Sequence, residues 1–218
     1  MEFKNVFITG SDKNNEWMLE WFLTNYRMHN TTPIIFANFG VSESVLKWAE
    51  KSFDGIIDMP KPKSIAWFLK PQSMIEASKL SKKVCWIDTD CHVIQSIDNI
   101  FKYTTPQKLS MAVDKPWTKR TGVIWHNSGI VAFEGTPNIL VSWEKNVRSS
   151  KQRGDQEVLH EMMGNDQLTR IIYIEDLPNV YNCLRLQLID GSDSINKKVM
   201  HWTGNKGKDV IKEMIKNA

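Results

Sequence analysis

Short apolar runs alternate with segments of helical periodicity along the first half of the chain. The apolar runs predict strands at residues 6–9, 34–37, 56–57 and 84–87. Between them, the spacing of apolar side chains predicts helices over residues 16–28, 42–49 and 71–78. Strands and helices that alternate in this order predict a parallel sheet with helices on both faces. Continuously apolar strands favour the same arrangement.

The second half of the chain shows a more mixed pattern. It predicts strands at residues 109–113, 130–133, 171–174 and 199–201, and helices at residues 137–147, 155–163 and 209–215. No internal repeat or Pro/Gly/Ser-rich linker divides the 218 residues, so we expect one α/β domain. Sheets of this kind bind ligands at the carboxyl ends of their strands, which makes the polar residues after each strand the first candidates for chemistry.

Composition and charge exclude several classes of protein. Hydrophobic residues make up 41% of the chain and charged residues 24%, as in globular rather than disordered or fibrous proteins. No stretch approaches the ~18–20 uncharged apolar residues of a membrane span, and the first residues lack the apolar part of a secretory signal. We therefore expect no transmembrane segment and a cytoplasmic location, in the host cytoplasm if the protein is viral. The net charge of +3 is spread along the chain, which argues against a nucleic-acid partner.

The strongest candidates for chemistry are Asp88 and Asp90, which directly follow the predicted strand at residues 84–87. Residues i and i+2 of an extended backbone point the same way, so these two carboxylates are expected to converge. Convergent carboxylates beside a cleft suit a hard divalent cation. The alternative, in which an aspartate only ends a strand or begins a turn, stays open.

Two weaker candidates lie in the second half of the chain. Asn127, Ser128 and Gly129 bring small and polar residues into an apolar strand, which suggests either a backbone close to a ligand or a simple turn. Asp155 and Gln156 begin a predicted helix, where Asp155 would also serve as an ordinary cap.

A last candidate is His201, which ends a predicted strand and precedes a glycine- and lysine-containing segment. A histidine there is able to complete a metal site, and the segment to hold phosphate oxygens, although a single histidine of this kind is more often structural. The chain has no Walker A sequence and no G-x-G-x-x-G after its first strand, which disfavours nucleoside triphosphatases and dinucleotide-binding proteins.

These four elements, in this order after a Rossmann-like first half, resemble the GT-A glycosyltransferases. The likeness is nearest to small phage or bacterial members of the glycogenin-like and bacterial galactosyltransferase families, and it extends from about Phe3 to Lys208. It implies a single GT-A domain over residues 1–218, with a mixed central β-sheet flanked by helices. Residues 1–95, approximately, would form the nucleotide-binding half, and residues 96–218 the half for the donor sugar and the acceptor.

The resemblance also implies a reaction. The expected donor is a nucleotide-diphosphate sugar held by Mn²⁺ or Mg²⁺, and the acceptor is an unidentified carbohydrate, glycan or protein. By analogy the metal ligands are Asp88, Asp90 and His201, and the catalytic residues are Asp155 and Gln156. The residues expected to contact the donor are Asp88, Thr9, Lys70, Asn127, Ser128, Gly129, Gly204 and Lys206.

One departure from those families concerns the diphosphate. They usually carry a lysine followed by Pro-Trp at the position that Gly207 holds here, with Lys206 and Lys208 on either side. Of these two lysines, we expect Lys206 to contact the diphosphate. The start of the helix at Asp155 is more similar to retaining than to inverting members, so transfer with retention of anomeric configuration is expected.

Three alternative functions stay open. A haloacid-dehalogenase-type phosphatase also ends a strand with D-x-D, but usually on its first strand and with a Thr or Val where His92 stands here. A sugar-nucleotide nucleotidyltransferase usually has a glycine-rich basic loop after its first strand, which residues 9–15 match poorly. The third is a non-catalytic protein that binds nucleotide sugars.

Overall fold

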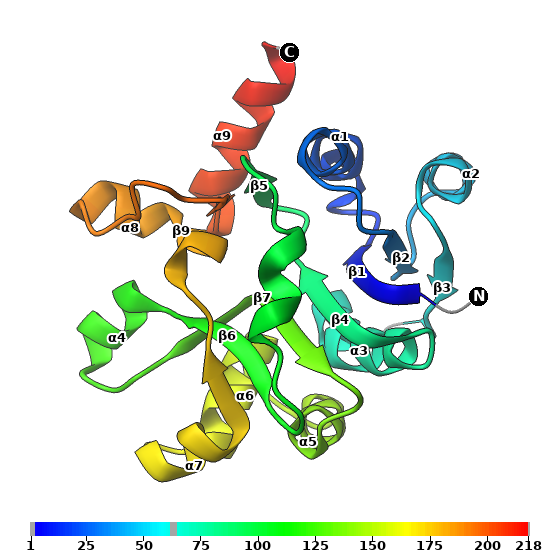
Figure 1. Cartoon of the computed structure of the whole chain (residues 1–218). Coiled ribbons are helices and arrows are strands. Elements are labelled where there is room, and N and C mark those ends of the chain that lie inside the picture. Colours follow the sequence, from blue (N-terminus) through cyan, green and yellow to red (C-terminus); the bar gives the residue numbers. More distant parts are fainter. Residues whose placement is uncertain (1–2, 62–64, 218) are drawn as a thin grey trace.

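Seven strands form one continuous sheet in the order β3-β2-β1-β4-β7-β6-β8 (Figure 1). The computed structural model describes residues 3–61 and 65–217. The strands of this sheet are β1 (Phe3–Ser11), β2 (Ile34–Asn38), β3 (Ile56–Asp58), β4 (Ser81–Ile87), β6 (Leu109–Val113), β7 (His126–Glu134) and β8 (Ile174–Asp176). A smaller sheet has the order β5-β10-β9 and consists of β5 (Cys91–Val93), β10 (Val199–His201) and β9 (Cys183–Leu184).

The part of the large sheet that the first half of the chain builds is parallel. β1 pairs in parallel with β2 and with β4, and β2 pairs in parallel with β3. The later strands make the sheet mixed, because β7 runs antiparallel to both β4 and β6. The predicted parallel first half and the mixed α/β sheet are therefore confirmed. The carboxyl ends of β1, β2 and β4 lie at one edge of the sheet, where ligands bind in folds of this kind.

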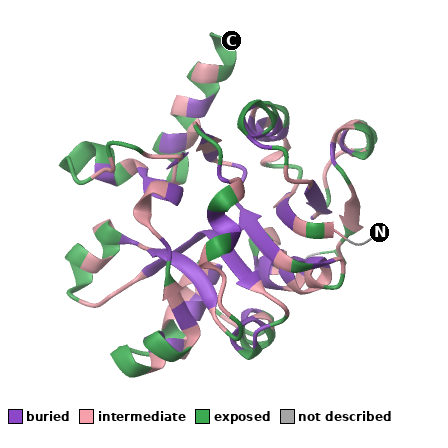
Figure 2. Ribbon diagram, viewed as in Figure 1, coloured by how far each residue is buried: buried purple, intermediate pink, exposed green. Residues whose placement is uncertain are grey.

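Helices cover both faces of this sheet, because successive residues of each strand point to opposite sides. Val6 and Ile8 share one apolar cluster with α3, α5 and α6, whereas Phe7 shares another with α1 and α2. The longer strands are accordingly buried along most of their length (Figure 2), whereas the edge strands β3 and β8 are only partly buried. Burial contributes about 1.5–3 kcal/mol for each large apolar side chain. The two apolar clusters, one on each face of the sheet, therefore fix the position of the strand ends that carry the candidate site residues. These helices are α1 (Leu19–His29), α2 (Glu43–Ser52), α3 (Lys70–Ser78), α5 (Asn138–Val147) and α6 (Asp155–Met163).

The remaining helices are short, apart from the closing one. They are α4 (Lys115–Thr121), α7 (Gln167–Tyr173), α8 (Arg185–Asp190) and α9 (Gly204–Lys216), with 3₁₀ turns η1 (Glu16–Met18), η2 (Ala66–Leu69), η3 (Asp98–Tyr103) and η4 (Asn179–Tyr181). Within residues 3–61 and 65–217, no helix has both the length and the apolar character needed to cross a bilayer.

The predicted strand at residues 171–174 is wrong over most of its length. Residues up to Tyr173 belong to α7, and β8 begins only at Ile174. The side chain of Asp166 caps this helix by accepting hydrogen bonds from the backbone N–H groups of Leu168 and Thr169. A cap that satisfies free N–H groups stabilises the helix by about 1 kcal/mol, which offsets the preference of the neighbouring isoleucines for strands.

Candidate active site

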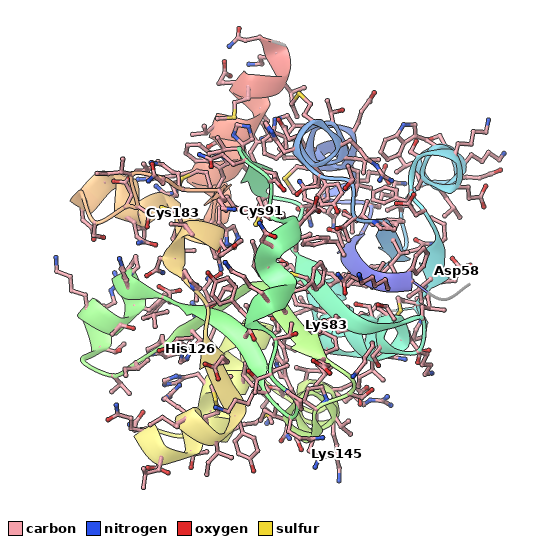
Figure 3. The ribbon with its side chains drawn as sticks, viewed as in Figure 1. Asp58, Lys83, Cys91, His126, Lys145 and Cys183 are labelled. Carbon is pink, nitrogen blue, oxygen red and sulfur yellow. The ribbon has the colours of Figure 1, made fainter. Side chains whose placement is uncertain are left out.

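The pairing of β5 with β10 brings the two ends of the candidate site together. Asp88 and Asp90 follow β4, and Cys91 then begins β5. β10 pairs antiparallel with β5 in a register that places His201 opposite Cys91. The backbone N–H of Trp202 also donates to the carbonyl oxygen of Asp90 at 3.0 Å. In Figure 3, Cys91 on β5 and Cys183 on β9 mark the two strands that flank β10.

His201 faces both carboxylates from the neighbouring strand. Its Nε2 lies 3.0 Å from Asp90 Oδ1 and 3.9 Å from Asp88 Oδ2. Burial favours the neutral form of both carboxyl groups. The pKa of Asp88 is raised, because burial and the nearby Asp90 together outweigh the attraction of Lys70. For Asp90 the facing imidazole outweighs burial and lowers the pKa. Burial opposes a charged His201, but the two aspartates raise the pKa of its imidazole.

Lys70 links this cluster to the start of α6. Its side chain is only 4% exposed, and Nζ lies 3.0 Å from Asp88 Oδ1 and 3.2 Å from Asp155 Oδ2. Nζ also donates to the carbonyl oxygen of Ser128 at 3.2 Å. Burial would lower the pKa of this lysine, but Asp155 and Asp88 together raise it, so the ammonium stays charged. Trp86 Nε1 donates to the same oxygen, Asp88 Oδ1, at 2.6 Å and helps to fix that carboxylate.

β7 places the Asn127–Ser128–Gly129 segment directly beside Asp88. The backbone N–H of Asp88 donates to the carbonyl oxygen of Gly129 at 2.8 Å. A Cβ atom on Gly129 would lie 2.1 Å from Cε1 of His201, so the imidazole requires a glycine at this position. From the sequence we expected either a nearby ligand or a simple turn at this segment, and in the structure the group that approaches Gly129 is His201.

Gln156 is held by hydrogen bonds from two directions. Its Oε1 accepts from Asn127 Nδ2 at 2.9 Å and from the backbone N–H of Ser128 at 3.1 Å. Its Nε2 donates to Asp114 Oδ2 at 3.2 Å. The amide therefore ties the start of α6 to β7 and to the start of α4.

Two adjoining cavities of about 270 and 340 Å³ share Lys70, Asp88, Asp90 and Asp155, and we call them together the cleft. Ten of the residues singled out from the sequence line it: Lys70, Asp88, Asp90, Asn127, Ser128, Gly129, Asp155, Gln156, His201 and Gly204.

Thr9 and Lys206 are not among the described residues that line the cleft. Thr9 is fully buried, because β1 continues past the predicted strand at residues 6–9 as far as Ser11. The predicted closing helix at residues 209–215 in fact begins at Gly204, which makes the segment after His201 its first turn. Lys206 is exposed on this turn.

Lys208, rather than Lys206, reaches the cleft. It lines the larger cavity, and its Nζ donates to Asn15 Oδ1 at 2.6 Å. Gly207 cannot be a lysine here, because a Cβ atom on it would lie 2.0 Å from the carbonyl oxygen of Trp202. The close approach of α9 to its own preceding segment thus explains why this chain departs from the pattern of the glycosyltransferases that it resembles.

Asp114 and Asn182 also belong to the site, although they were not among the residues predicted from the sequence. Asp114 is 2% exposed, lines the cleft and follows the apolar strand β6, the same signal that marked Asp88. Asn182 is fully buried and contacts both Asn127 and His201. No local pattern marks it, because its partners lie far away in the chain.

The donor atoms around Asp90 fit a divalent cation. Two carboxylates and an imidazole provide the oxygen and nitrogen atoms that such ions bind. Lys70 contacts the carboxylates of Asp88 and Asp155, whereas Asp90 faces the imidazole of His201, and a cation bound between them would balance the charge of Asp90.

Cys91 also lies close to this group, since one ligand atom each from Asp90, Cys91 and His201 falls within 4.8 Å of the others. Burial, followed by the charges of Asp90 and Asp88, raises the pKa of the Cys91 thiol. A neutral thiol is a weak ligand for a hard ion.

The arrangement of strands and helices is that of the GT-A glycosyltransferases. No protein-family model and no curated protein matches the chain, but solved structures do. The galactosyltransferase LgtC, in complex with donor and acceptor sugar analogues, matches with a TM-score of 0.61 and 11% identity over 97% of this chain and 95% of that one. The glycosyltransferase GlyE of Streptococcus pneumoniae TIGR4 matches with a TM-score of 0.65 and 16% identity, over 93% of this chain and 56% of that one.

A third match is a glycosyltransferase involved in the glycosylation of the major capsid of PBCV-1. Its TM-score is 0.64, with 11% identity over 97% of this chain and 98% of that one. At such identities the likeness establishes the fold, which the sequence analysis expected, and the chemistry has to be argued from the residues of the cleft.

Proposed function

We propose that this protein is a metal-dependent glycosyltransferase that transfers a sugar from a nucleotide-diphosphate donor to a carbohydrate, glycan or protein acceptor. The observation that carries the proposal is the convergence of Asp88, Asp90 and His201 beside Asn127 and Asp155 in one cleft. The fold adds support, since the solved structures that resemble this chain are named glycosyltransferases.

Asp88, Asp90 and His201 would hold Mn²⁺ or Mg²⁺. When bound, such an ion offsets the negative charge that grows on a departing diphosphate. Lys70 neutralises part of the charge of Asp88 and Asp155 and keeps both carboxylates directed into the cleft. Lys70 is thus proposed to hold Asp88 and Asp155 in position for the donor as well as to contact the donor itself.

The start of α9 is proposed to bind the diphosphate together with Lys208. Thr203 and Gly204 line the cleft at the N-terminus of this helix, where free backbone N–H groups attract anions. Lys208 lines the same cleft, whereas Lys206 is exposed. This geometry favours Lys208 over the Lys206 assignment made from the sequence.

The nucleoside is proposed to lie at the carboxyl ends of β1 and β2. A cavity of about 550 Å³ there is lined by residues that include Asp12, Asn38, Phe39 and Gly40. This placement uses the first half of the chain as the nucleotide-binding half, as the sequence analysis expected. It replaces Thr9 with residues that follow the strand ends, because Thr9 is buried within β1.

Asp155 is proposed to stabilise the sugar in the transition state, with retention of anomeric configuration. Such transition states carry positive charge on the ring, which a nearby carboxylate stabilises. The carbonyl oxygen of Gln156 already accepts two hydrogen bonds, so we assign Gln156 mainly to positioning Asn127 and Ser128. Proton NMR of the first product formed tests the stereochemistry, and a product anomer opposite to that of the donor would contradict retention.

The geometry favours this function over the three alternatives. A haloacid-dehalogenase-type phosphatase carries its aspartates after the first strand, whereas Asp88 and Asp90 follow β4. A nucleotidyltransferase would need a basic glycine-rich loop after β1, and the residues that follow β1 are Asp12, Lys13 and Asn14. Against a non-catalytic binding protein stand the intact candidate metal ligands Asp88, Asp90 and His201, and a measurement of donor hydrolysis separates it from an enzyme.

The proposal is tested by a thermal-shift screen of UDP-glucose, UDP-galactose, UDP-N-acetylglucosamine and GDP-mannose, each with and without Mn²⁺. A donor at 100 times its dissociation constant adds about 2.7 kcal/mol of apparent stability. Hydrolysis of the stabilising donor is then measured. Binding without hydrolysis or transfer would favour the non-catalytic alternative, and no Mn²⁺-dependent binding of any donor would contradict the proposal.

Asp90→Asn and Asp209→Asn form a matched pair of variants for this screen. Both remove one carboxylate, but Asp90 faces His201 in the cleft whereas Asp209 lies on the exposed side of α9. Asp90→Asn should abolish the Mn²⁺-dependent stabilisation, and Asp209→Asn should leave it unchanged. An equal response of the two variants would show that the metal does not bind where we place it.

A further inference from the structure

Asn182 connects the proposed metal ligand His201 to the segment proposed to face the donor sugar. It lies between η4 and β9, is fully buried, and was not marked by any sequence pattern. Its Nδ2 donates to Asn127 Oδ1 at 2.8 Å, and its Oδ1 lies 3.0 Å from Nδ1 of His201. Both ends of the amide are therefore engaged by residues of the cleft.

The direction of these hydrogen bonds is fixed by a backbone group. The N–H of Gly129 can only donate, and it donates to Asn127 Oδ1 at 2.9 Å. Asn127 Oδ1 is thus an acceptor, so Asn182 must present its NH₂ group to it and its carbonyl oxygen to His201. An acceptor that faces Nδ1 of His201 requires a hydrogen on that nitrogen.

A second backbone group fixes the same direction from the other end. The N–H of Ser128 donates to Gln156 Oε1 at 3.1 Å, which makes that oxygen an acceptor. Asn127 therefore turns its NH₂ group towards Gln156, at 2.9 Å, and its oxygen towards Asn182. The backbone N–H groups of Ser128 and Gly129 thus lead to the same orientation for the side-chain amides of Gln156, Asn127 and Asn182.

We propose that Asn182 is a positioning residue that holds His201 with its proton on Nδ1 and with the lone pair of Nε2 directed at the metal site. Nε2 is the nitrogen that faces Asp90 at 3.0 Å and Asp88 at 3.9 Å. A neutral imidazole binds a metal only through its unprotonated nitrogen. The partners that hold the other nitrogen of such histidines typically change metal affinity by about 10–100-fold when they are removed.

Burial is what gives Asn182 control over the tautomer. His201 is 4% exposed and Asn182 is fully buried, so water has little access to compete for Nδ1. A buried amide that lost a partner would leave a polar group unsatisfied, which keeps the series of hydrogen bonds in one arrangement. The metal role of Asn182 and the free lone pair on Nε2 rest on the proposed function, because without a metal ion the carboxylate of Asp90 accepts a hydrogen from Nε2 at 3.0 Å. The hydrogen on Nδ1, which Asn182 accepts, does not rest on it.

The tautomer is measured by long-range ¹H–¹⁵N NMR of imidazole nitrogens in protein labelled with ¹⁵N-histidine. Spectra are recorded with Mg²⁺, which is diamagnetic, at a pH where the imidazole is neutral, and His201→Gln identifies the signals of His201. We expect a protonated Nδ1 and an unprotonated Nε2. A proton on Nε2 in the wild-type protein overturns the proposal without any variant.

Asn182→Leu and Asn182→Asp then test the cause. Asn182→Leu replaces the side chain by one of similar size that cannot accept a hydrogen bond. We expect that His201 then no longer holds a single tautomer, and that the affinity for Mn²⁺, measured by EPR, is about 10–100-fold lower. Asn182→Asp keeps an acceptor for Nδ1 and should retain the tautomer, which a purely structural role would not require. Unchanged tautomer and Mn²⁺ affinity in Asn182→Leu would overturn the proposal. If that variant does not fold, loss of the tautomer in Asn182→Asp would do so.

The two possible failures are distinguishable. A wild-type protein that binds no divalent ion but shows the Nδ1 proton would contradict the proposed function and leave the hydrogen bond from Nδ1 to Asn182 intact. A protein that binds Mn²⁺ and hydrolyses a donor while His201 carries its proton on Nε2 would support the proposed function and contradict the role of Asn182.

Discussion

Gly129→Ala should displace His201 and weaken the metal site while leaving the protein folded. The new Cβ would lie 2.1 Å from Cε1 and 2.5 Å from Nδ1 of His201, whereas carbon atoms in contact are about 3.5–4.0 Å apart. The imidazole must therefore move by more than about 1 Å. A shift of that size breaks the 3.0 Å contact of Nε2 with Asp90 or that of Nδ1 with Asn182.

The expected cost in stability is modest. Overpacking of a core typically costs about 1–3 kcal/mol, and the alanine recovers about 0.4–1 kcal/mol by restricting the unfolded chain. The loss of Mn²⁺ affinity should be larger in relative terms, about 10–100-fold, because the ligand itself is displaced. The metal dissociation constant, measured by EPR, should thus change far more than the midpoint of urea unfolding.

Gly135→Ala is the matched control. Gly135 directly follows β7, has a φ of +68° and has open space around its Cβ position. Alanine in this left-handed conformation costs about 1–2 kcal/mol, so the control loses similar stability without touching His201. Wild-type Mn²⁺ affinity in Gly129→Ala, or an equal loss in both variants, would refute the reasoning.

Three further predictions follow from the geometry of the cleft and its surroundings. Lys208→Ala should weaken donor binding by about tenfold or more, which is the contribution of one charge-assisted hydrogen bond, whereas Lys206→Ala should leave it unchanged. Isothermal titration with donor and Mn²⁺ measures both affinities, and a larger loss in Lys206→Ala would show that Lys206 is the diphosphate contact. Asp155→Asn should lower kcat by about 10²–10³-fold with little change in donor affinity, and a comparable loss in affinity would argue against a transition-state role. The pKa of His160 is lowered to about 4, first by burial and then by the nearby Arg170. The unfolded chain therefore binds a proton at this residue more readily than the folded protein does, and the free energy of unfolding decreases as the pH falls from about 6.5 towards 4. Because His160 is partly exposed, we expect about 1–2 kcal/mol from this residue, and His160→Gln should flatten the pH dependence of urea unfolding in that range; an unchanged slope would contradict the assignment.

The large sheet could be predicted because its signals are local. Each of the early strands is a short apolar run, and alternation with helices leaves few topologies open, since crossover connections between parallel strands are almost always right-handed. The position of Asp88 and Asp90 after β4 followed directly from this pattern.

Some local signals competed with one another, and there the prediction was wrong. Ile171 and Ile172 favour a strand, but the cap at Asp166 recruits them into α7. The glycines after His201 suggested a loop, but the close packing of Gly207 on the backbone of Trp202 lets α9 start at Gly204. In both cases a specific contact outweighed an average preference.

The sequence alone determined the fold class and the residue types at the cleft, because strand periodicity and the chemistry of Asp, Asn and His are carried by each short segment. Only the tertiary structure decided which of these residues meet. The β5–β10 pairing brings His201 to Asp90 across a long stretch of chain, and the same folding step buries Asn182 between His201 and Asn127. Contacts of this kind are formed by packing between distant segments, so no window of sequence contains both partners, and Asn182 looks like any other asparagine until the chain is folded.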